Sequence, residues 1–422
     1  MQCQFDEIID RSGTSCIKFE AFRSGRPNLP ADTIPMWIAD MDFACPQPIL
    51  DAMHRRLDRR ILGYSGLIDP AYHRAVTGWM RRRFGWDADA EQLVSSSGIV
   101  TAIQQSVARL TQPGDGVLLF TPTYMPFYSA IVDQGRVPVF CRLQRDAAGR
   151  FGIDFEAFER LAAQPGSKLL FLCSPHNPTG RVWTPAELGR IGEICFANDV
   201  FVVSDEIHAD LTRTGVKHTP FQKLFPGEKR LIACTAPSKT FNIAGNQLAN
   251  LFIPDEAIRT EWRQKHYCGE PSPLAIDAVI AAYNECEDWL DALRAYLDGN
   301  FRLAADTLAA ALPATGYAVP EGTYLMWLNA ACAGPDEAAL RARIEAAGLC
   351  VEYASDFADN ADGFLRINIA CPRSVLRERS GGSCMCSHNR LRPTVLRGEL
   401  QFSVNTQTNR PERTPFSPAC LK

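Results

Sequence analysis

Residues 169–173 read Leu-Leu-Phe-Leu-Cys, and the polar turn Ser-Pro-His-Asn-Pro-Thr-Gly follows directly at 174–180. The five apolar residues do not alternate with polar ones, which indicates a strand that is buried on both faces. Three further runs have the same character, at 117–120, 200–203 and 231–234. Because strands buried on both faces are typical of parallel sheets, these runs predict a mostly parallel sheet.

Longer amphipathic stretches separate the apolar runs. Residues 99–110, which follow Gly98, have a helical pattern. Residues 184–198 open with Thr-Pro-Ala-Glu, in which the threonine caps a helix, the proline takes its first position and the acid lies in its first turn. The repeated order of strand and helix predicts a doubly wound α/β domain over residues 45–285.

The pattern changes after residue 285. The sequence then predicts a long helix at 286–312, a β segment at 316–329, a helix at 336–347 and an alternating strand at 363–369. These elements predict a smaller α+β domain over residues 286–378, which we expect the N-terminal residues 1–44 to complete. From Arg379 onward the chain has no sustained periodicity and carries four prolines, which predicts a poorly structured tail over 379–422.

Composition excludes several classes of protein. Of 422 residues, 46% are apolar and 22% charged, which is typical of a folded globular chain and not of a disordered one. The net charge of −4 gives no electrostatic argument for binding nucleic acid. No apolar run is long enough to span a membrane, and the acidic N-terminus does not resemble a signal peptide. We therefore expect a cytoplasmic protein that binds neither nucleic acid nor a membrane.

The fifteen cysteines are scattered singly along most of the chain. Without an export signal, disulfides would not persist, so most of these residues are expected to be buried thiols. The one cluster, Cys384-Met-Cys386-Ser-His388, does not have the spacing of a structural zinc site. We predict no metal site.

Three polar side chains follow the ends of predicted strands, where open α/β sheets bind their ligands. Asn177 follows the run at 169–173, Asp205 follows the run at 200–203, and Lys239 comes shortly after the run at 231–234. Each residue alone has an ordinary structural explanation, as a surface turn, a helix-capping acid or an exposed lysine. Together they suit one cofactor, pyridoxal 5′-phosphate (PLP).

The chemistry of PLP explains this choice of residues. Lys239 would form the Schiff base, Asp205 would keep the pyridine nitrogen protonated so that the ring withdraws electrons, and Asn177 would hydrogen-bond the phenolic oxygen. A semi-buried aspartate is costly unless it has a cationic or hydrogen-bonding partner, which a protonated ring nitrogen provides.

The sequence resembles the class I/II aminotransferases of fold type I, and within them the MalY/PatB-like branch of C–S lyases (cystathionine β-lyases). The matching segments lie at 36–43, 63–65, 121–124, 173–180, 204–208, 238–242, 321–324 and 366–373. The resemblance covers residues 1–378. It implies a large, mostly parallel sheet of seven strands and a small α+β domain, and a homodimer with shared active sites.

The resemblance also assigns roles to further residues. Tyr124 would stack on the pyridine ring, and Arg366 would clamp the α-carboxylate of the substrate together with Asn177. The backbone of Gly98, Ile99 and Val100, at the start of a helix, would hold the phosphate. Weaker assignments place Ser238 on the phosphate, His208 in support of the site, and Tyr64 on the phosphate of the partner subunit's cofactor.

The implied activity is β-elimination on cystathionine or related cysteine S-conjugates, which yields a thiol, pyruvate and ammonia. Lys239 would remove the α-proton as a general base. An aminotransferase uses the same residues and remains the main alternative, and a catalytically weak PLP-binding regulatory protein is a third. The sequence does not identify the preferred sulfur amino acid.

The tail departs from the resemblance. In the family, the chain after the Cys-Pro-Arg segment at 371–373 completes a C-terminal helix of the small domain, whereas here that helix is expected to stop near Glu378. A shifted reading frame would produce such a composition. Loss of the helix would expose apolar surface, so we expect reduced stability or solubility with the cofactor site retained.

Overall fold

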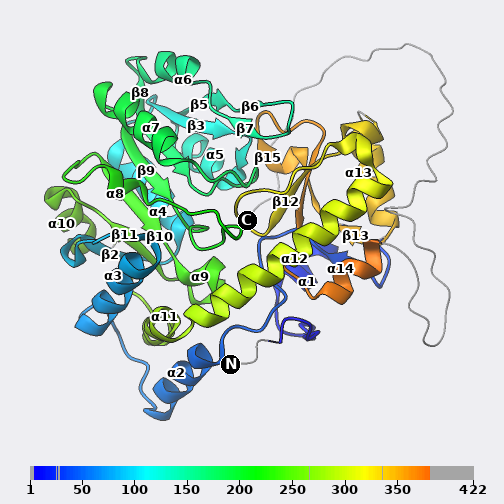
Figure 1. Ribbon diagram of the computed structural model, residues 1–422. Helices are drawn as coiled ribbons and strands as arrows, with labels where there is room; N and C mark the ends of the chain where they lie inside the picture. Colours follow the sequence, from blue (N-terminus) through cyan, green and yellow to red (C-terminus); the bar gives the residue numbers. More distant parts are fainter. Residues whose placement is uncertain (1–3, 25, 27–28, 266, 335, 381–422) are drawn as a thin grey trace.

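The computed structural model describes residues 4–24, 26, 29–265, 267–334 and 336–380 (Figure 1). The tail predicted over 379–422 therefore lies outside the described residues from residue 381 onward, as does the cluster of Cys384, Cys386 and His388. No helix among the described residues is both long enough and apolar enough to cross a membrane.

A seven-stranded sheet forms the larger part of the molecule, in the order β2-β11-β10-β9-β8-β3-β5. Its strands are β2 (Leu93–Ser96), β3 (Gly116–Thr121), β5 (Val137–Arg142), β8 (Ser167–Cys173), β9 (Phe201–Asp205), β10 (Leu231–Thr235) and β11 (Ala249–Phe252). Strand β11 is antiparallel to both of its neighbours, β10 and β2, and the other adjacent pairs of this sheet are parallel. The four predicted strands and the mostly parallel sheet are confirmed.

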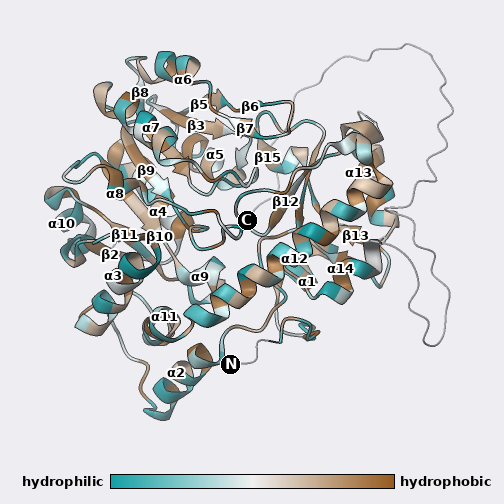
Figure 2. Ribbon diagram, in the orientation of Figure 1, coloured by the Kyte–Doolittle hydropathy of each residue, from teal (hydrophilic) through white to brown (hydrophobic). Residues whose placement is uncertain are grey.

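Helices cover both faces of this sheet. From β8, Leu169 and Phe171 pack with α4 (Ile99–Leu110) and α5 (Met125–Val132) on one face. Leu170 and Leu172 pack with α6 (Phe155–Ala162) and α7 (Pro185–Ala197) on the other. Alternate residues of one strand thus enter two cores, which explains its continuous apolar sequence. Figure 2 shows the hydrophobic colouring over these strands.

The two helices predicted between the strands are confirmed. Helix α4 follows Gly98, and α7 begins after Thr184. The Thr184 side chain accepts the backbone N–H of Glu187, whose carboxylate in turn accepts the backbone N–H of Thr184, so the helix opens with a capping box.

A second, three-stranded sheet has the order β12-β16-β14 and is antiparallel. Its strands are β12 (Leu325–Asn329), β14 (Glu352–Tyr353) and β16 (Phe364–Asn368). The predicted helices of this region are present as α12 (Glu287–Ala311) and α13 (Glu337–Ala346). Helix α12 crosses the front of the molecule in Figure 1.

Two predictions in this region are wrong in detail. The β segment predicted at 316–329 is a strand only from Leu325, because Gly316 and Thr323 have positive φ angles and Pro320 lacks an N–H. The strand at 363–369 does not alternate between buried and exposed residues. Strand β16 is the central strand, so Leu365 and Ile367 enter a core while Arg366 and Asn368 are buried on the other face.

The N-terminal residues pack beside the second sheet, where β1 (Ile34–Pro35) pairs in parallel with β13 (Leu349–Cys350). The other strands are β4 (Thr123–Tyr124), β6 (Gln144–Arg145), β7 (Phe151–Gly152) and β15 (Phe357–Ala358). The other helices are α1 (Ile17–Glu20), α2 (Gln47–Asp58), α3 (Pro70–Phe84), α8 (Phe221–Leu224), α9 (Pro237–Thr240), α10 (Glu256–Gln264), α11 (Pro273–Glu285) and α14 (Arg373–Ser380).

Candidate active site

The three polar strand ends lie side by side at the carboxyl edge of the large sheet. Strand β9 lies between β8 and β10, and Asp205 is the register partner of Cys173 on one side and of Cys234 on the other. The turn after β8 and the short helix α9 after β10 therefore flank Asp205. Asn177 and Lys239 belong to these two segments.

The turn that carries Asn177 depends on Gly180. Gly180 has a φ of +69°, and a side chain there would collide with Pro320. Asn177 is buried, and its Oδ1 accepts a hydrogen bond from Nη1 of Arg366 at 2.8 Å. Asn177 therefore links the edge of the large sheet to the second sheet.

Asp205 is a buried carboxyl group with little compensation. Its side chain accepts one hydrogen bond, at 3.0 Å from the backbone N–H of Ile207, and it has no ion pair among the residues that the structure describes. Burial raises the pKa of Asp205 to about 7, and the charge of Glu206 adds to this effect. A protonated pyridine nitrogen is a partner that would restore the ionised form.

Lys239 is desolvated by the surrounding protein. Burial lowers the pKa of its amine to about 8, and Nζ donates a hydrogen bond to the carbonyl oxygen of Ala39 at 2.6 Å. The same carbonyl accepts the Tyr324 hydroxyl at 3.0 Å. A lysine with a lowered pKa is a stronger candidate for imine formation and proton transfer than an exposed one.

Ala39 and Tyr324 were not predicted as site residues. Both lie in segments that carry the family resemblance, at 36–43 and 321–324, and that resemblance is the only sequence signal that pointed to them. The hydrogen bonds that the Ala39 carbonyl accepts from Lys239 and Tyr324 span 200 and 285 residues of chain.

Arg366 lies in the middle of β16 with its side chain only 1% exposed. Its Nη2 forms an ion pair with Oε2 of Glu352, on the neighbouring strand β14, and the Phe357 ring lies 5.1 Å from its guanidinium carbon. Glu352 was also missed, because a strand of two residues has no sequence periodicity.

Tyr124 caps helix α5 and is partly buried. Burial raises the pKa of its hydroxyl, and the charges of Arg366 and Asp205 act on it, so it faces the same space as these two residues. His208 is buried, its Nδ1 has no hydrogen-bond partner in the part of the chain that the structure describes, and burial lowers its pKa to about 3. The Thr235 hydroxyl, at the end of β10, is likewise buried without a partner.

The backbone at residues 98–100 begins the twelve-residue helix α4. Gly98 has a φ of +128°, and no atom would contact a side chain there, so its backbone faces open space. The first N–H groups of a helix have no intrahelical acceptor and bind anions readily. Ser238 lies in α9, one residue before Lys239, and is partly buried.

Tyr64 is not brought to this site by its own chain. It lies between α2 and α3 and is fully exposed, as are large parts of Ile61, Leu62 and Ile68. The roles predicted for Tyr64 and for the other site residues remain predictions.

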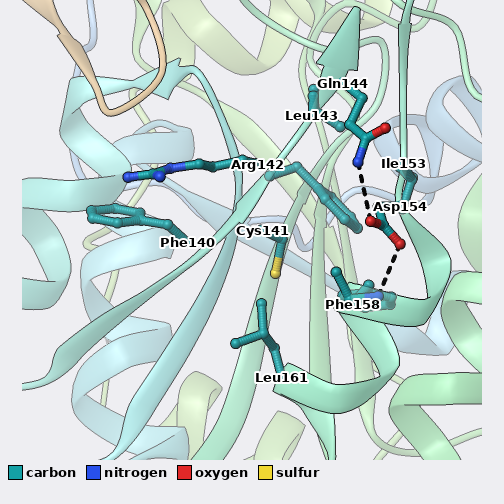
Figure 3. A pocket seen from close by; sticks show the side chains of 11 residues that line it. Phe140, Cys141, Arg142, Leu143, Gln144, Ile153, Asp154, Phe158 and Leu161 are labelled. Atoms are coloured by element: carbon teal, nitrogen blue, oxygen red, sulfur yellow. Dashed lines mark hydrogen bonds between the residues drawn. The ribbon is translucent and has the colours of Figure 1, made fainter.

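A separate hollow of about 470 Å³ lies against strand β5 and contains none of the predicted site residues (Figure 3). Phe158 and Leu161 of α6 line it together with Cys141 of β5. At its rim, Gln144 donates a hydrogen bond to Asp154 at 3.1 Å. Within the described residues, no group of histidines, cysteines and acids could hold a metal ion, and the described cysteines are free thiols.

The residues present fit PLP. Within the described residues, Asp205 has no ion pair and the polar atoms of His208 and Thr235 near the strand ends have no hydrogen-bond partner, while Lys239 has a lowered pKa. Each of these features suits a bound group with a basic ring nitrogen, an aldehyde and further polar atoms.

Known proteins resemble this chain over most of its length. A family model described as aminotransferase class I and II matches residues 32–379. Cystathionine beta-lyase PatB of Bacillus subtilis is 38% identical over 380 residues, which cover 89% of this chain and 97% of that protein. Protein MalY of Escherichia coli is 34% identical over 385 residues, with coverage of 90% and 97%. The PLP-bound C–S lyase of Staphylococcus hominis superposes with a TM-score of 0.84 at 38% identity, covering 89% of this chain and 95% of that one.

Proposed function

The chain belongs to the aminotransferase class I and II family of PLP-dependent enzymes, and we propose that it is a C–S lyase acting by β-elimination on cystathionine or related cysteine S-conjugates. The products are a thiol, pyruvate and ammonia. The observation that carries this proposal is the similarity at 38% identity, over most of both chains, to a cystathionine β-lyase and to a PLP-bound C–S lyase.

PLP, when bound, supplies an electron-withdrawing ring that stabilises negative charge on the substrate's α-carbon. Asp205 would hold a proton on the ring nitrogen, and Asn177 would donate its amide N–H to the phenolic oxygen. The N-terminus of α4, at residues 98–100, would hold the phosphate, with Ser238 beside it. Tyr124 would lie against one face of the ring, and His208 would support the site as a neutral imidazole.

The substrate is oriented by Arg366, which would bind its α-carboxylate. The amine of Lys239 would remove the α-proton at Nζ. Because burial lowers the pKa of Lys239 to about 8, a useful fraction of this amine is neutral near neutral pH and accepts a proton. Loss of the α-proton allows a thiolate on the β-carbon to depart.

Aminotransfer is the second candidate function. The matching family model is described by that activity, and Lys239, Asp205, Asn177 and Arg366 serve both reactions. A catalytically weak PLP-binding regulatory protein is a poorer proposal, because it would not need the carboxylate clamp.

We also propose a homodimer in which Tyr64 reaches the cofactor phosphate of the partner subunit. Full exposure of Tyr64, next to exposed Ile61, Leu62 and Ile68, supports this assembly because such apolar surface is unusual in a monomer. The proposed domain division remains 1–44 and 286–378 for the small domain and 45–285 for the large one, and the cytoplasmic location remains a prediction.

The test of the proposed function is incubation of the PLP-loaded enzyme with L-cystathionine alone, with assays for pyruvate and free thiol. Equal release of both supports β-elimination. If neither is released although the protein carries the yellow cofactor, the lyase proposal is wrong. A keto acid is then added as an acceptor, and formation of a new amino acid would support the aminotransferase.

A further inference from the structure

Glu352 and Arg366 face each other directly across strands β14 and β16. They are register partners in this antiparallel pair, so their side chains leave the same face of the small sheet. Oε2 of Glu352 forms an ion pair with Nη2 of Arg366. The chain thus places its own carboxylate on the guanidinium that would bind the substrate's carboxylate.

Both terminal nitrogens of Arg366 have partners from this chain, since Nη1 donates to Asn177. The Glu352 side chain is 18% exposed and that of Arg366 is 1% exposed, while Oε2 of Glu352 is itself buried. Among the described residues, Nε of Arg366 has no hydrogen-bond partner. A substrate carboxylate that binds both terminal nitrogens of Arg366 must therefore displace Glu352, a group of its own charge.

The surroundings of Glu352 favour its neutral form more than water does. Burial raises the pKa of its carboxyl, and the charge of Asp356, in the turn after β14, acts in the same direction. Arg366 on β16 and Lys239 on α9 oppose this effect, and the Tyr124 hydroxyl also faces the carboxylate. A proton on Glu352 would let it leave Arg366 without becoming an unpaired buried charge.

We propose that Glu352 lowers substrate affinity by competing with the substrate: it occupies Arg366 in the free enzyme and gives way to the substrate's α-carboxylate with uptake of a proton from solvent. This inference deepens the proposed function and rests on the role of Arg366 in it. Substrate affinity is then set by exchange of one carboxylate for another. Affinity falls as the pH rises, because the ionised glutamate holds Arg366 more strongly.

The test uses the PLP-loaded wild-type enzyme and Glu352→Gln, an isosteric variant that cannot carry the negative charge. The probe is 2-aminoisobutyrate, which has an α-amino group and a carboxylate but no α-proton to lose. Titration calorimetry in two buffers of different ionisation enthalpy gives both the dissociation constant and the number of protons taken up. We expect the variant to bind the probe about threefold to tenfold more tightly.

Proton uptake separates competition from a structural role. Wild-type enzyme should take up more protons on binding than Glu352→Gln, with a difference of up to about one. With a substrate, KM should fall by a larger factor than any change in kcat. Equal or weaker binding by the variant, or equal proton uptake by the two proteins, would overturn the proposal.

Three further variants keep the result interpretable. Glu228→Gln removes a glutamate that is 21% exposed and also pairs with an arginine, Arg230. This variant should leave the dissociation constant of the probe and the number of protons taken up unchanged. Glu352→Ser takes the place of the glutamine variant if that protein does not fold. Arg366→Lys should lose probe binding; unchanged binding would remove Arg366 from the site and the competition with it. Because the probe needs no β-elimination, a failed lyase assay leaves this test intact.

Discussion

Asp205 and Arg366 are both buried ionisable groups, but their surroundings compensate them differently. Asp205, at the edge of the large sheet, accepts a single backbone hydrogen bond and has no ion pair in the described part of the chain. Arg366, in the small sheet, has Glu352 and Asn177 on its two terminal nitrogens. An uncompensated buried charge gains stability when an opposite charge binds, whereas a compensated one binds a ligand only by exchange. On the proposed roles, the large sheet would gain a partner for Asp205 from the cofactor, and the small sheet would bind the substrate by replacing Glu352 on Arg366.

The largest expected effect is the loss of activity in Lys239→Ala. The large-sheet edge then keeps Asp205 but lacks the amine proposed to link to PLP and to remove the α-proton. We expect the rate of pyruvate release from L-cystathionine to fall by at least about 10³-fold. The matched control is Lys229→Ala, which removes an exposed lysine and should retain full activity. Substantial activity in Lys239→Ala would show that another group is the base.

Arg366→Ala tests the compensated side of the comparison. It removes the proposed carboxylate clamp and leaves Glu352 largely buried without its ion-pair partner. We expect kcat/KM to fall by about 10²-fold to 10³-fold, and the free energy of unfolding by about 3 kcal/mol. Urea unfolding and steady-state kinetics give the two values. Arg230→Ala, whose ion pairs are half exposed, should cost about 1 kcal/mol or less. If Arg366→Ala lowers the free energy of unfolding no more than Arg230→Ala does, other groups compensate the charge of Glu352 once Arg366 is removed.

The same two regions differ in how far the sequence predicts them. Asn177, Asp205 and Lys239 each follow an apolar run that is continuous because its strand is buried on both faces. A polar residue after such a run marks a strand end, and parallel strand ends share one edge of a sheet. The sheet, its main helices and the placement of these three residues were therefore predictable.

The contacts of the small sheet were not predictable in this way. Glu352 belongs to a strand of two residues, and its pairing with Arg366 depends on register, which no local pattern encodes. The contact of Lys239 with the Ala39 carbonyl joins two segments far apart in the chain. The β segment predicted at 316–329 is a strand only from Leu325, because positive φ angles and Pro320 exclude one over 316–324.

Asp205→Asn tests the uncompensated side, in protein stripped of cofactor. Burial raises the pKa of Asp205 to about 7 from the value near 4 that an unfolded chain has. The folded protein therefore binds the proton of Asp205 more tightly than the unfolded chain does. The contribution of this proton to the free energy of unfolding is complete below about pH 4 and is lost as the pH rises to about 7. Asparagine has no such dependence. The change in the free energy of unfolding from wild type to Asp205→Asn should therefore be about 2 kcal/mol more favourable to the folded variant at pH 8 than at pH 5.

Urea unfolding of the cofactor-free proteins at the two pH values measures this difference. Asp199→Asn is the matched control, since its carboxylate is 89% exposed. An equal effect of Asp205→Asn at pH 5 and pH 8 would show that Asp205 titrates as an exposed carboxyl does, and the contrast with Arg366 would then be wrong.

The smallest expected effect concerns Tyr64, a proposed site residue that its own chain does not bring to the candidate active site. If Tyr64 reaches the partner subunit's cofactor, Tyr64→Phe removes one hydrogen bond to the phosphate and should weaken PLP binding by about threefold to tenfold. Absorbance titration of stripped protein measures this affinity, and Tyr128→Phe, in a ring that stacks on Phe140, is the control. Light scattering on the same samples gives the mass. A dimer with unchanged PLP affinity would remove Tyr64 from the phosphate site, and a monomer with weakened affinity would place its action within one chain. Only a dimer with weakened affinity supports the proposed role of Tyr64, in which residues of two subunits hold the cofactor phosphate. The roles proposed for Asp205 and Arg366 do not require a second subunit.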